Sequence, residues 1–255
     1  MTTLGIIGTG NLAGFLVAGL ERAGRPYDIV LSPRNAGKAA ILARYYGAAV
    51  ARSNQEVVEL ASIVVTSVLP QQAEAALAPL RFRDEQIVIS VLAAVSHERV
   101  AALAQPARAA VAMMPGHANA LGMGPSCLYP TEPRARALLE YLGPVFAFDD
   151  ARHFAAAAAF GAFSGMTYGW MAHVAQWFER KGLQPSTARQ LVACTLRGNA
   201  EVLLTPKEDF GQIIQGIAPP GGITELGNRT LSEAGGHSGW DLALDAVSRR
   251  INGKG

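Results

Sequence analysis

Gly8, Gly10 and Ala13 have the spacing of a phosphate-binding turn. They follow the apolar run Leu4–Ile7 and match the G-x-G-x-x-A form of the dinucleotide fingerprint. Gly8 allows a tight turn, Gly10 has no Cβ to hold a diphosphate away, and Ala13 lets the next helix pack on its strand. The free N–H groups of that helix would face the phosphates. The predicted phosphate contacts are Gly8, Thr9, Gly10, Asn11 and Leu12.

The residues after the second predicted strand indicate which nicotinamide coenzyme the turn would take. The strand Tyr27–Leu31 has no Asp or Glu at its end, where an NAD site would hold the ribose hydroxyls. Arg34 supplies a fixed positive charge, and Ser32 and Asn35 add hydrogen-bond donors, which suits the 2′-phosphate of NADP. The alternative is that Arg34 is an ordinary solvated loop residue. We predict NADPH rather than NADH.

The ends of three later strands should border the nicotinamide. The runs Ile63–Leu69, Gln86–Leu92 and Ala109–Met114 are continuous and apolar, as in strands that are buried on both faces. Ligands of open α/β sheets bind beyond the carboxyl ends of the strands. The predicted contacts on this side are Val68, Leu69, Pro70, Ala93 and Pro115.

Three groups could act on a substrate. His117 could protonate a substrate or orient a water, because imidazole is the commonest acid–base group in enzymes, although a surface-loop histidine is the alternative. The Thr224 hydroxyl and nearby amides could bind an anion, or the loop could be a plain turn between helices. Tyr168 could donate a hydrogen bond or belong to the core. The predicted catalytic residues are His117, Thr224 and Tyr168, and the predicted substrate contacts are Gly116, Pro220, Gly221, Gly222, Ile223 and Thr224.

The rest of the chain supplies the elements that must hold these residues. Half of the 255 residues are hydrophobic, enough for a large core. Strands and helices alternate through residue 148, which predicts a Rossmann-type, doubly wound parallel sheet of α/β class. The pattern of the residues after 148 predicts helices only. We predict a dinucleotide-binding domain over 1–150 and an all-helical substrate and dimerisation domain over 151–255.

Composition argues against several other classes. The net charge is +2 and the 22 basic residues are scattered, so we expect no nucleic-acid partner. Cys127 and Cys194 lie far apart without metal-ligand spacing, which predicts reduced thiols and no metal. The amino terminus lacks the basic segment of a signal peptide, so we expect a cytoplasmic protein.

One segment raises the possibility of a membrane span. Residues Phe154–Phe178 contain no Asp, Glu, Lys or Arg, and Gly161, Gly165 and Gly169 lie four apart. The run is rich in Ala and Gly and only mildly apolar. We therefore expect no membrane span, but a helix packed against a second copy of the chain, with His173 in the core or at that interface.

Five motifs, in order along the chain, resemble those of the pyrroline-5-carboxylate reductase family, NADPH-using enzymes that make proline from its cyclic imine. They are Gly8–Ala13, Val68–Gln71, Ser90–Ser96, Met113–Pro115 and Pro220–Thr224. The resemblance runs from end to end and implies a reductase whose helical half forms an interlocked homodimer. It also implies a substrate between the nicotinamide and the Pro220–Thr224 loop. Related hydroxyacid dehydrogenases would carry a catalytic lysine on the long helix, and Phe154–Phe178 has none.

The sequence departs from the family pattern where substrate would bind. The family's Met-Pro-Asn-Thr-Pro is here Met114–Ala118, without the Asn and the Thr. The family's Ser before Pro-Gly-Gly is here Pro219, which removes a hydroxyl and an N–H donor. Its Ser-Gly-Ser-Gly-Pro-Ala-Tyr segment corresponds to Ala162–Tyr168.

We therefore predict an NADPH-dependent oxidoreductase that acts on CH–NH bonds. It would reduce a cyclic imine, pyrroline-5-carboxylate, to proline by hydride transfer to C=N, a reaction that needs orientation and a protonated nitrogen. One alternative keeps the chemistry but changes the substrate to another imine or a keto compound admitted by Gly116, His117 and Pro219. A second alternative is a non-catalytic, nucleotide-binding homologue.

Overall fold

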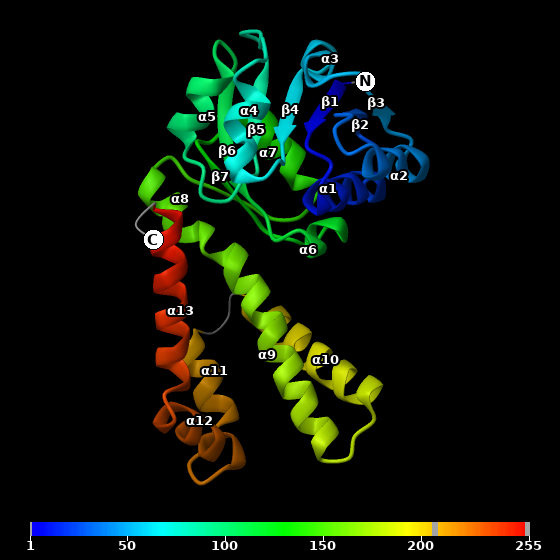
Figure 1. The fold of residues 1–255 in the computed structure, drawn as a ribbon. Coiled ribbons are helices and arrows are strands. Elements are labelled where there is room, and N and C mark those ends of the chain that lie inside the picture. The colour runs from blue at the N-terminus through cyan, green and yellow to red at the C-terminus, as the bar shows by residue number, and fades with distance from the viewer. Residues whose placement is uncertain (1, 206–208, 253–255) are drawn as a thin grey trace. The chain divides into compact units, whose positions relative to one another are not determined.

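An eight-stranded sheet forms the centre of the amino-terminal part of the chain (Figure 1). The computed structural model describes residues 2–205 and 209–252. The strand order is β3-β2-β1-β4-β5-β6-β7-β8. The strands are β1 Thr2–Ile7, β2 Tyr27–Leu31, β3 Ala49–Val50, β4 Ile63–Thr66, β5 Ile87–Ser90, β6 Arg108–Met113, β7 Ser126–Tyr129 and β8 Val145–Ala147. This order places the carboxyl ends of β1, β2, β4, β5 and β6 at one edge.

Helices cover both faces of this sheet. They are α1 Asn11–Arg22, α2 Ala36–Tyr46, α3 Asn54–Leu60, the 3₁₀ turn η1 Pro70–Gln72, α4 Ala73–Leu77, α5 His97–Ala104, α6 His117–Ala120, α7 Pro133–Glu140 and α8 Ala151–Ala158. Two apolar clusters form, one on each face, because alternate strand residues point in opposite directions. Leu4 and Ile6 of β1 belong to one cluster and Ile7 to the other. The predicted doubly wound α/β fold is confirmed.

One strand is missing from the sequence-based prediction. β7 runs antiparallel to β6, with Val111 opposite Tyr129, whereas every other strand pair is parallel. A parallel return requires a long crossover, usually a helix packed on the sheet. The connection between β6 and β7 contains only the four-residue α6, so the chain turns back directly.

The remaining helices belong mainly to a second compact unit, residues 162–246, while the described residues from Val247 onward group with the first unit. They are α9 Phe160–Arg180, α10 Pro185–Leu204, α11 Phe210–Ile217, α12 Ile223–Glu233 and α13 Gly236–Ile251. The predicted all-helical second half is confirmed, and the domain boundary at residue 150 stays a prediction. The expectation that Pro206 breaks a helix lies outside the described residues.

The apolar run Phe154–Phe178 is not one helix. α8 ends at Ala158, and the Ala159 N–H turns back to the Ala156 and Ala157 carbonyls before α9 begins. A Cβ on Gly161 would lie 2.7 Å from Met113 Sδ, so this glycine allows a close approach within the chain. A Cβ on Gly165 or Gly169 would meet nothing within 4 Å. None of the helices that the structure describes has the length and apolarity to cross a bilayer.

The second unit has almost no core of its own. Among its described residues only Ala188 and Val192 are buried, and His173 is exposed, so its predicted place in a core is wrong for the single chain. Large apolar side chains remain exposed on its helices, among them Phe163, Trp170, Trp177, Leu204, Phe210, Ile217, Leu226 and Leu242. Patches of this kind are typical of surfaces that another chain covers.

Helix ends follow local signals with one difference. Gly47 ends α2 in the left-handed conformation, as its position predicts. Ser53 caps α3 by accepting the Glu56 N–H at 3.1 Å. The Glu56 carboxylate accepts the N–H of Arg52 at 2.5 Å, one residue before the Ser53 N–H that a capping box would use.

A buried carboxylate stabilises the start of α7. Glu132 is 7% exposed, its Oε2 accepts the Ala135 N–H at 2.7 Å, and its Oε1 lies 3.6 Å from Arg108 and 3.5 Å from Arg134. Glu132→Ala removes the cap and leaves a half-buried guanidinium without its counter-charge. We expect a loss of about 2–3 kcal/mol in the free energy of unfolding, measured by urea denaturation.

Glu140→Ala is the matched control for this prediction. Glu140 lies on the same helix and pairs with Arg136 at 2.8 Å, but both side chains are about half exposed. Its loss should cost less than about 1 kcal/mol. Equal effects of the two substitutions would contradict a structural role for the buried carboxylate.

Candidate active site

The glycine turn after β1 is held by the ends of two neighbouring strands. Gly8 has φ +99°, and its N–H donates to Ser32 Oγ at 2.9 Å. Its carbonyl accepts the Ser67 hydroxyl at 2.6 Å. A Cβ on Gly8 would lie 2.8 Å from the backbone of Ser67 and Val68. Only glycine fits this position, because both the positive φ and the close approach exclude a side chain.

The next residues of the turn fit a diphosphate. A Cβ on Gly10 would have only the Ser67 carbonyl within 4 Å, at 3.8 Å, so the space above this residue is open. Gly10 caps α1 without a side-chain hydrogen bond, which leaves the first N–H groups of the helix available. Ala13 is buried against the sheet, as predicted. Thr9 is 4% exposed, and its hydroxyl has no hydrogen-bond partner within the described residues.

A cavity of about 340 Å³ lies beyond the ends of β1 and β2, where the adenosine of a dinucleotide would bind. Ser32, Arg34 and Val68 line it together with Gly8. Arg34 is exposed, and its guanidinium donates to Gln72 Oε1 at 3.1 Å, a neutral partner. The structure thus brings together four of the predicted coenzyme residues, from three loops that are far apart in sequence.

Two of the residues predicted to bind the 2′-phosphate, Ser32 and Asn35, accept backbone hydrogen bonds within the protein. Ser32 is 1% exposed and accepts the Gly8 N–H, so its oxygen holds the turn while its hydroxyl proton can still be donated. Asn35 caps α2, because its Oδ1 accepts the Lys38 N–H at 3.1 Å. Arg34 is therefore the main group on this loop that can pair with a phosphate.

Lys38 and Asn54 also lie at this site but were not predicted from the sequence. Lys38 Nζ donates to Asn11 Oδ1 at 3.1 Å, which places an ammonium at the first residue of α1. Asn54 lines the 340 Å³ cavity from the start of α3. The sequence did hold a signal for Lys38, because this residue lies in the first turn of α2, three residues after the capping residue Asn35. The sequence offered no comparable signal for Asn54, because its place depends on how α3 packs.

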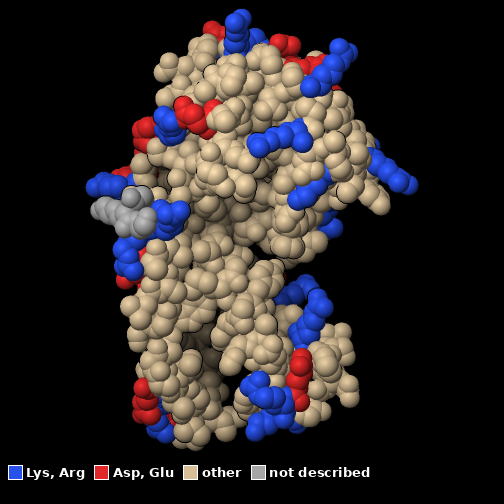
Figure 2. Space-filling model, viewed as in Figure 1, with Lys and Arg blue, Asp and Glu red and all other residues tan. Residues whose placement is uncertain are grey.

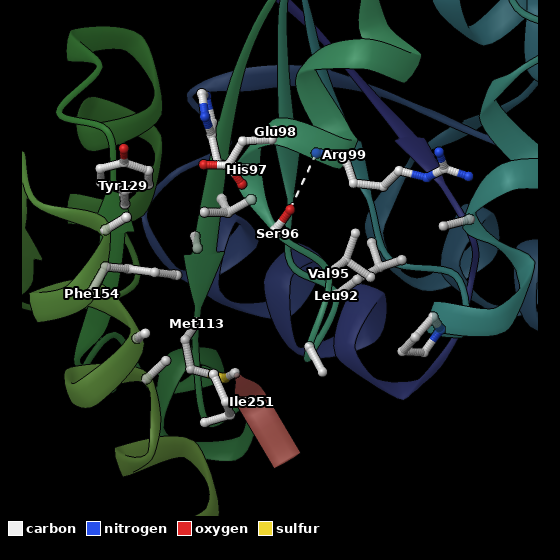
Figure 3. A pocket seen from close by; sticks show the side chains of 18 of the residues that line it. Leu92, Val95, Ser96, His97, Glu98, Arg99, Met113, Tyr129, Phe154 and Ile251 are labelled. Atoms are coloured by element: carbon white, nitrogen blue, oxygen red, sulfur yellow. Dashed lines mark hydrogen bonds between the residues drawn. The ribbon is translucent and has the colours of Figure 1, made fainter. Parts of the chain in front are cut away.

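A larger cavity of about 620 Å³ lies beside the carboxyl ends of β5 and β6 (Figure 3). Pro70 lines it, and Ala94 with φ +58° follows the predicted contact Ala93. Its other apolar walls are Leu92, Val95, Val111, Met113, Tyr129, Phe154, Ala155, Ala158 and Ile251. The charged side chains among its lining residues come from α4 and the first turn of α5, where Arg99 forms an ion pair with Glu74.

His117 lies on the other side of β6, against α1. Its ring packs on Phe15 with 4.2 Å between the centroids, and it is not among the residues that line the 620 Å³ cavity. Gly116 has φ +94°, and a Cβ there would lie 2.7 Å from the Phe15 ring. Asn119 is fully buried and accepts the Gly116 N–H at 2.9 Å while it donates to the Gly124 carbonyl at 2.8 Å. This amide fixes the loop that carries Gly116 and His117.

The predicted substrate residues near the carboxyl terminus belong to the second unit. Gly221 has φ +76°, and the Gly222 N–H donates to the Pro219 carbonyl at 2.9 Å. The turn therefore uses the Gly222 amide in this conformation, and the anion-binding roles of Gly221 and Gly222 stay predictions. Ile223 and Thr224 begin α12, and Ile223 is 91% exposed. Tyr168 is exposed on α9, and the substrate roles of Tyr168, Pro220, Ile223 and Thr224 stay predictions.

Neither cysteine shows the features of a reactive or metal-binding group. Cys127 is buried, and burial raises the pKa of its thiol to about 11, so it stays protonated at neutral pH. Cys194 is exposed on α10 and is also a free thiol. In the described parts of the chain no three His, Cys, Asp or Glu side chains gather closely enough to hold a metal. On the face drawn in Figure 2, basic and acidic side chains are interspersed.

Two family models match separate parts of the chain. Residues 3–94 match the family described as NADP oxidoreductase coenzyme F420-dependent. Residues 151–253 match the family described as pyrroline-5-carboxylate reductase dimerisation. The pyrroline-5-carboxylate reductase of Pseudomonas aeruginosa is 30% identical over 260 residues, which cover 97% of this chain and 94% of that protein. A Bacillus spizizenii enzyme of the same name is 26% identical and covers 96% and 86%.

Solved structures share the fold. The 1-pyrroline-5-carboxylate reductase of Streptococcus pyogenes superposes with a TM-score of 0.87 at 23% identity and covers 98% of this chain and 97% of that one. The Plasmodium falciparum pyrroline carboxylate reductase, solved with NADP bound, has a TM-score of 0.88 at 17% identity, with full coverage of both chains (100% each). An Aspergillus terreus reductive aminase has a TM-score of 0.62 at 19% identity over 80% of this chain and 75% of that one.

The Gly116 turn should not tolerate a side chain. Gly116→Ala would combine an unfavourable φ with a clash against Phe15, so we expect the free energy of unfolding to fall by about 2 kcal/mol or more. Gly37→Ala is the control, because Gly37 lies in α2 with nothing within 4 Å of an added Cβ. It should leave stability unchanged or raise it by up to about 1 kcal/mol. Thermal or urea unfolding of both variants measures the difference, and a harmless Gly116→Ala would refute the packing described here.

Proposed function

The chain belongs to the pyrroline-5-carboxylate reductase family of NAD(P)-dependent oxidoreductases, and from this membership we propose that it reduces pyrroline-5-carboxylate to proline with NADPH. The observation that carries the proposal is the open glycine turn beside a cavity with an arginine. Gly8 and Gly10 leave room for a diphosphate, and Arg34 lines the cavity proposed for the adenosine, where it would pair with a 2′-phosphate. The end of β2 offers no carboxylate to compete with that phosphate.

The protein's part in the reaction is to bind, orient and exclude water. When bound, the reduced coenzyme supplies a hydride to the imine carbon, and the electron pair of the C=N bond passes to the protonated nitrogen. Leu69, Pro70, Ala93 and Pro115 would border the nicotinamide and hold its ring at the carboxyl edge of the sheet. Val68, predicted to join them, lines the 340 Å³ cavity proposed for the adenosine. A cyclic imine is basic enough to arrive partly protonated, so orientation is the main requirement.

The second unit would supply the carboxylate site. The N–H groups of Ile223 and Thr224 and the Thr224 hydroxyl lie at the amino end of α12, where the helix dipole favours an anion. Tyr168 on α9 is a further donor in the proposal, and His117 remains a candidate to protonate the nitrogen or orient a water. Gly116 contributes by letting the loop before His117 pass close to Phe15.

We also propose a cytoplasmic homodimer formed through the helical unit. The match of residues 151–253 to a dimerisation family supports it, and so does the nearly complete lack of buried side chains in that unit. A second copy would cover the exposed aromatic and aliphatic side chains of α9, α10 and α11.

The activity itself is tested by following NADPH oxidation at 340 nm with racemic pyrroline-5-carboxylate. We expect proline as the product, identified by mass spectrometry. The control is NADPH binding, followed by the change in its fluorescence without substrate. Tight NADPH binding with no oxidation by this imine or by other cyclic imines would instead favour a non-catalytic nucleotide-binding protein.

Arg34 and Lys38 should bind different parts of the coenzyme. We expect Arg34→Ala to weaken NADPH binding about tenfold and NADH binding by less than about twofold, because only NADPH has a 2′-phosphate. Lys38 lies at Asn11, beside the predicted diphosphate, so Lys38→Ala should weaken both coenzymes by the same factor of about five to ten.

Fluorescence titration of the two reduced coenzymes measures these affinities without turnover. Arg44→Ala, in the last turn of α2, removes a positive charge far from the turn and serves as the control for general electrostatics. An equal loss for NADPH and NADH in Arg34→Ala would show that Arg34 does not select the phosphorylated coenzyme.

A further inference from the structure

The 620 Å³ cavity is larger than the proposed substrate requires. Its volume falls within the range of pockets that bury a drug-sized ligand. A five-membered ring with one carboxylate would fill only a small part of it. The cavity lies within the first unit and includes Pro70, which is also a predicted nicotinamide contact, so it adjoins the proposed reaction centre.

The chemistry of the walls favours an apolar occupant. Figure 3 shows Phe154, Met113, Ile251 and Leu92 around the space, with the polar groups of α5 gathered at one end. The lining arginine, Arg99, already forms an ion pair with Glu74. The cavity therefore offers little attraction to a carboxylate of a ligand. An aromatic ring and a thioether instead give surfaces on which another ring can pack.

Small residues on α8 keep this space open. Ala155 and Ala158 line the cavity from the same side of the helix, and Ala158 is buried. The adjacent Ala156 is exposed and is not among the lining residues. Larger side chains at the lining positions would occupy the cavity directly, whereas the same change at Ala156 would point away from it.

We propose that this cavity holds a ring-sized apolar substituent on the imine carbon, so that the substrates of this enzyme include cyclic imines substituted at that carbon. The inference rests on the function proposed above and makes it more specific. The hydride would reach the same carbon, and the C=N electron pair would pass to the same nitrogen. The substituent would lie against Tyr129, Phe154 and Met113 and gain affinity from the apolar surface it buries.

A matched pair of substrates and a matched pair of variants test the inference. The substrates are 1-pyrroline-5-carboxylate and its 2-phenyl derivative, which differ only in the group on the imine carbon. We expect the wild-type protein to reduce both, with kcat/KM values within about tenfold of each other. Ala155→Leu should lower the ratio of kcat/KM for the phenyl substrate to that for the parent by about tenfold or more. Ala156→Leu should leave that ratio unchanged.

Binding of the product amine gives a readout that does not depend on turnover. In the presence of NADP⁺, 5-phenylproline, the product of reducing the 2-phenyl imine, should raise the melting temperature of the wild-type protein and of Ala156→Leu, but much less that of Ala155→Leu. Size-exclusion chromatography should show the same assembly for both variants. A change of assembly in Ala155→Leu alone would show that this position contacts a second copy instead of a substituent, which overturns the inference.

The two proposals fail in different ways. If the parent imine is reduced while the phenyl derivative is neither reduced nor its product bound, the inference is wrong and the proposed function stands. If the Ala155→Leu and Ala156→Leu ratios agree, the cavity does not hold the substituent. If the protein binds NADPH but oxidises it with neither imine, the proposed function itself is wrong.

Discussion

The close approach of three strand ends around Gly8 is the constraint on which the rest of the site depends. Hydroxyls from β2 and from the end of β4 bind the N–H and the carbonyl of this one residue, Ser32 at 2.9 Å and Ser67 at 2.6 Å. The backbone of the β4 loop is so near that a methyl group would not fit. This packing aims the first turn of α1, with its free N–H groups, at the carboxyl edge of the sheet, and it places the loops with Arg34 and Val68 beside that turn.

The cations near the turn have neutral partners. Arg34 binds an amide oxygen of Gln72, and Lys38 binds an amide oxygen of Asn11. Elsewhere in the first unit arginines pair with carboxylates, as Arg25 does with Glu21. An amide is a weaker partner than a phosphate because it carries no net charge, so these two side chains can exchange it for an anionic ligand at small cost. The same reasoning sets the 620 Å³ cavity apart, since its Arg99 is already neutralised by Glu74.

The two units differ in how far they bury their apolar side chains. The first buries apolar side chains on both faces of a sheet. The second consists of helices whose aromatic and aliphatic side chains remain in contact with water in the single chain. An exposed apolar surface of that extent is unfavourable, and its burial by another copy would contribute stability that the unit lacks alone.

Local sequence determined the order of elements, the glycine turn and many helix ends, because hydrophobic periodicity, capping residues and glycine act over a few residues. The Leu4–Ala13 pattern, Gly47 and the end of α10 at Leu204 are examples. Only the tertiary structure decided the antiparallel β7, the break between α8 and α9, the use of the Gly222 amide in its own turn, and the contacts of Lys38 with Asn11 and of His117 with Phe15. Each of these depends on groups that are distant along the chain or on space that neighbouring elements leave, and no local pattern encodes such distances.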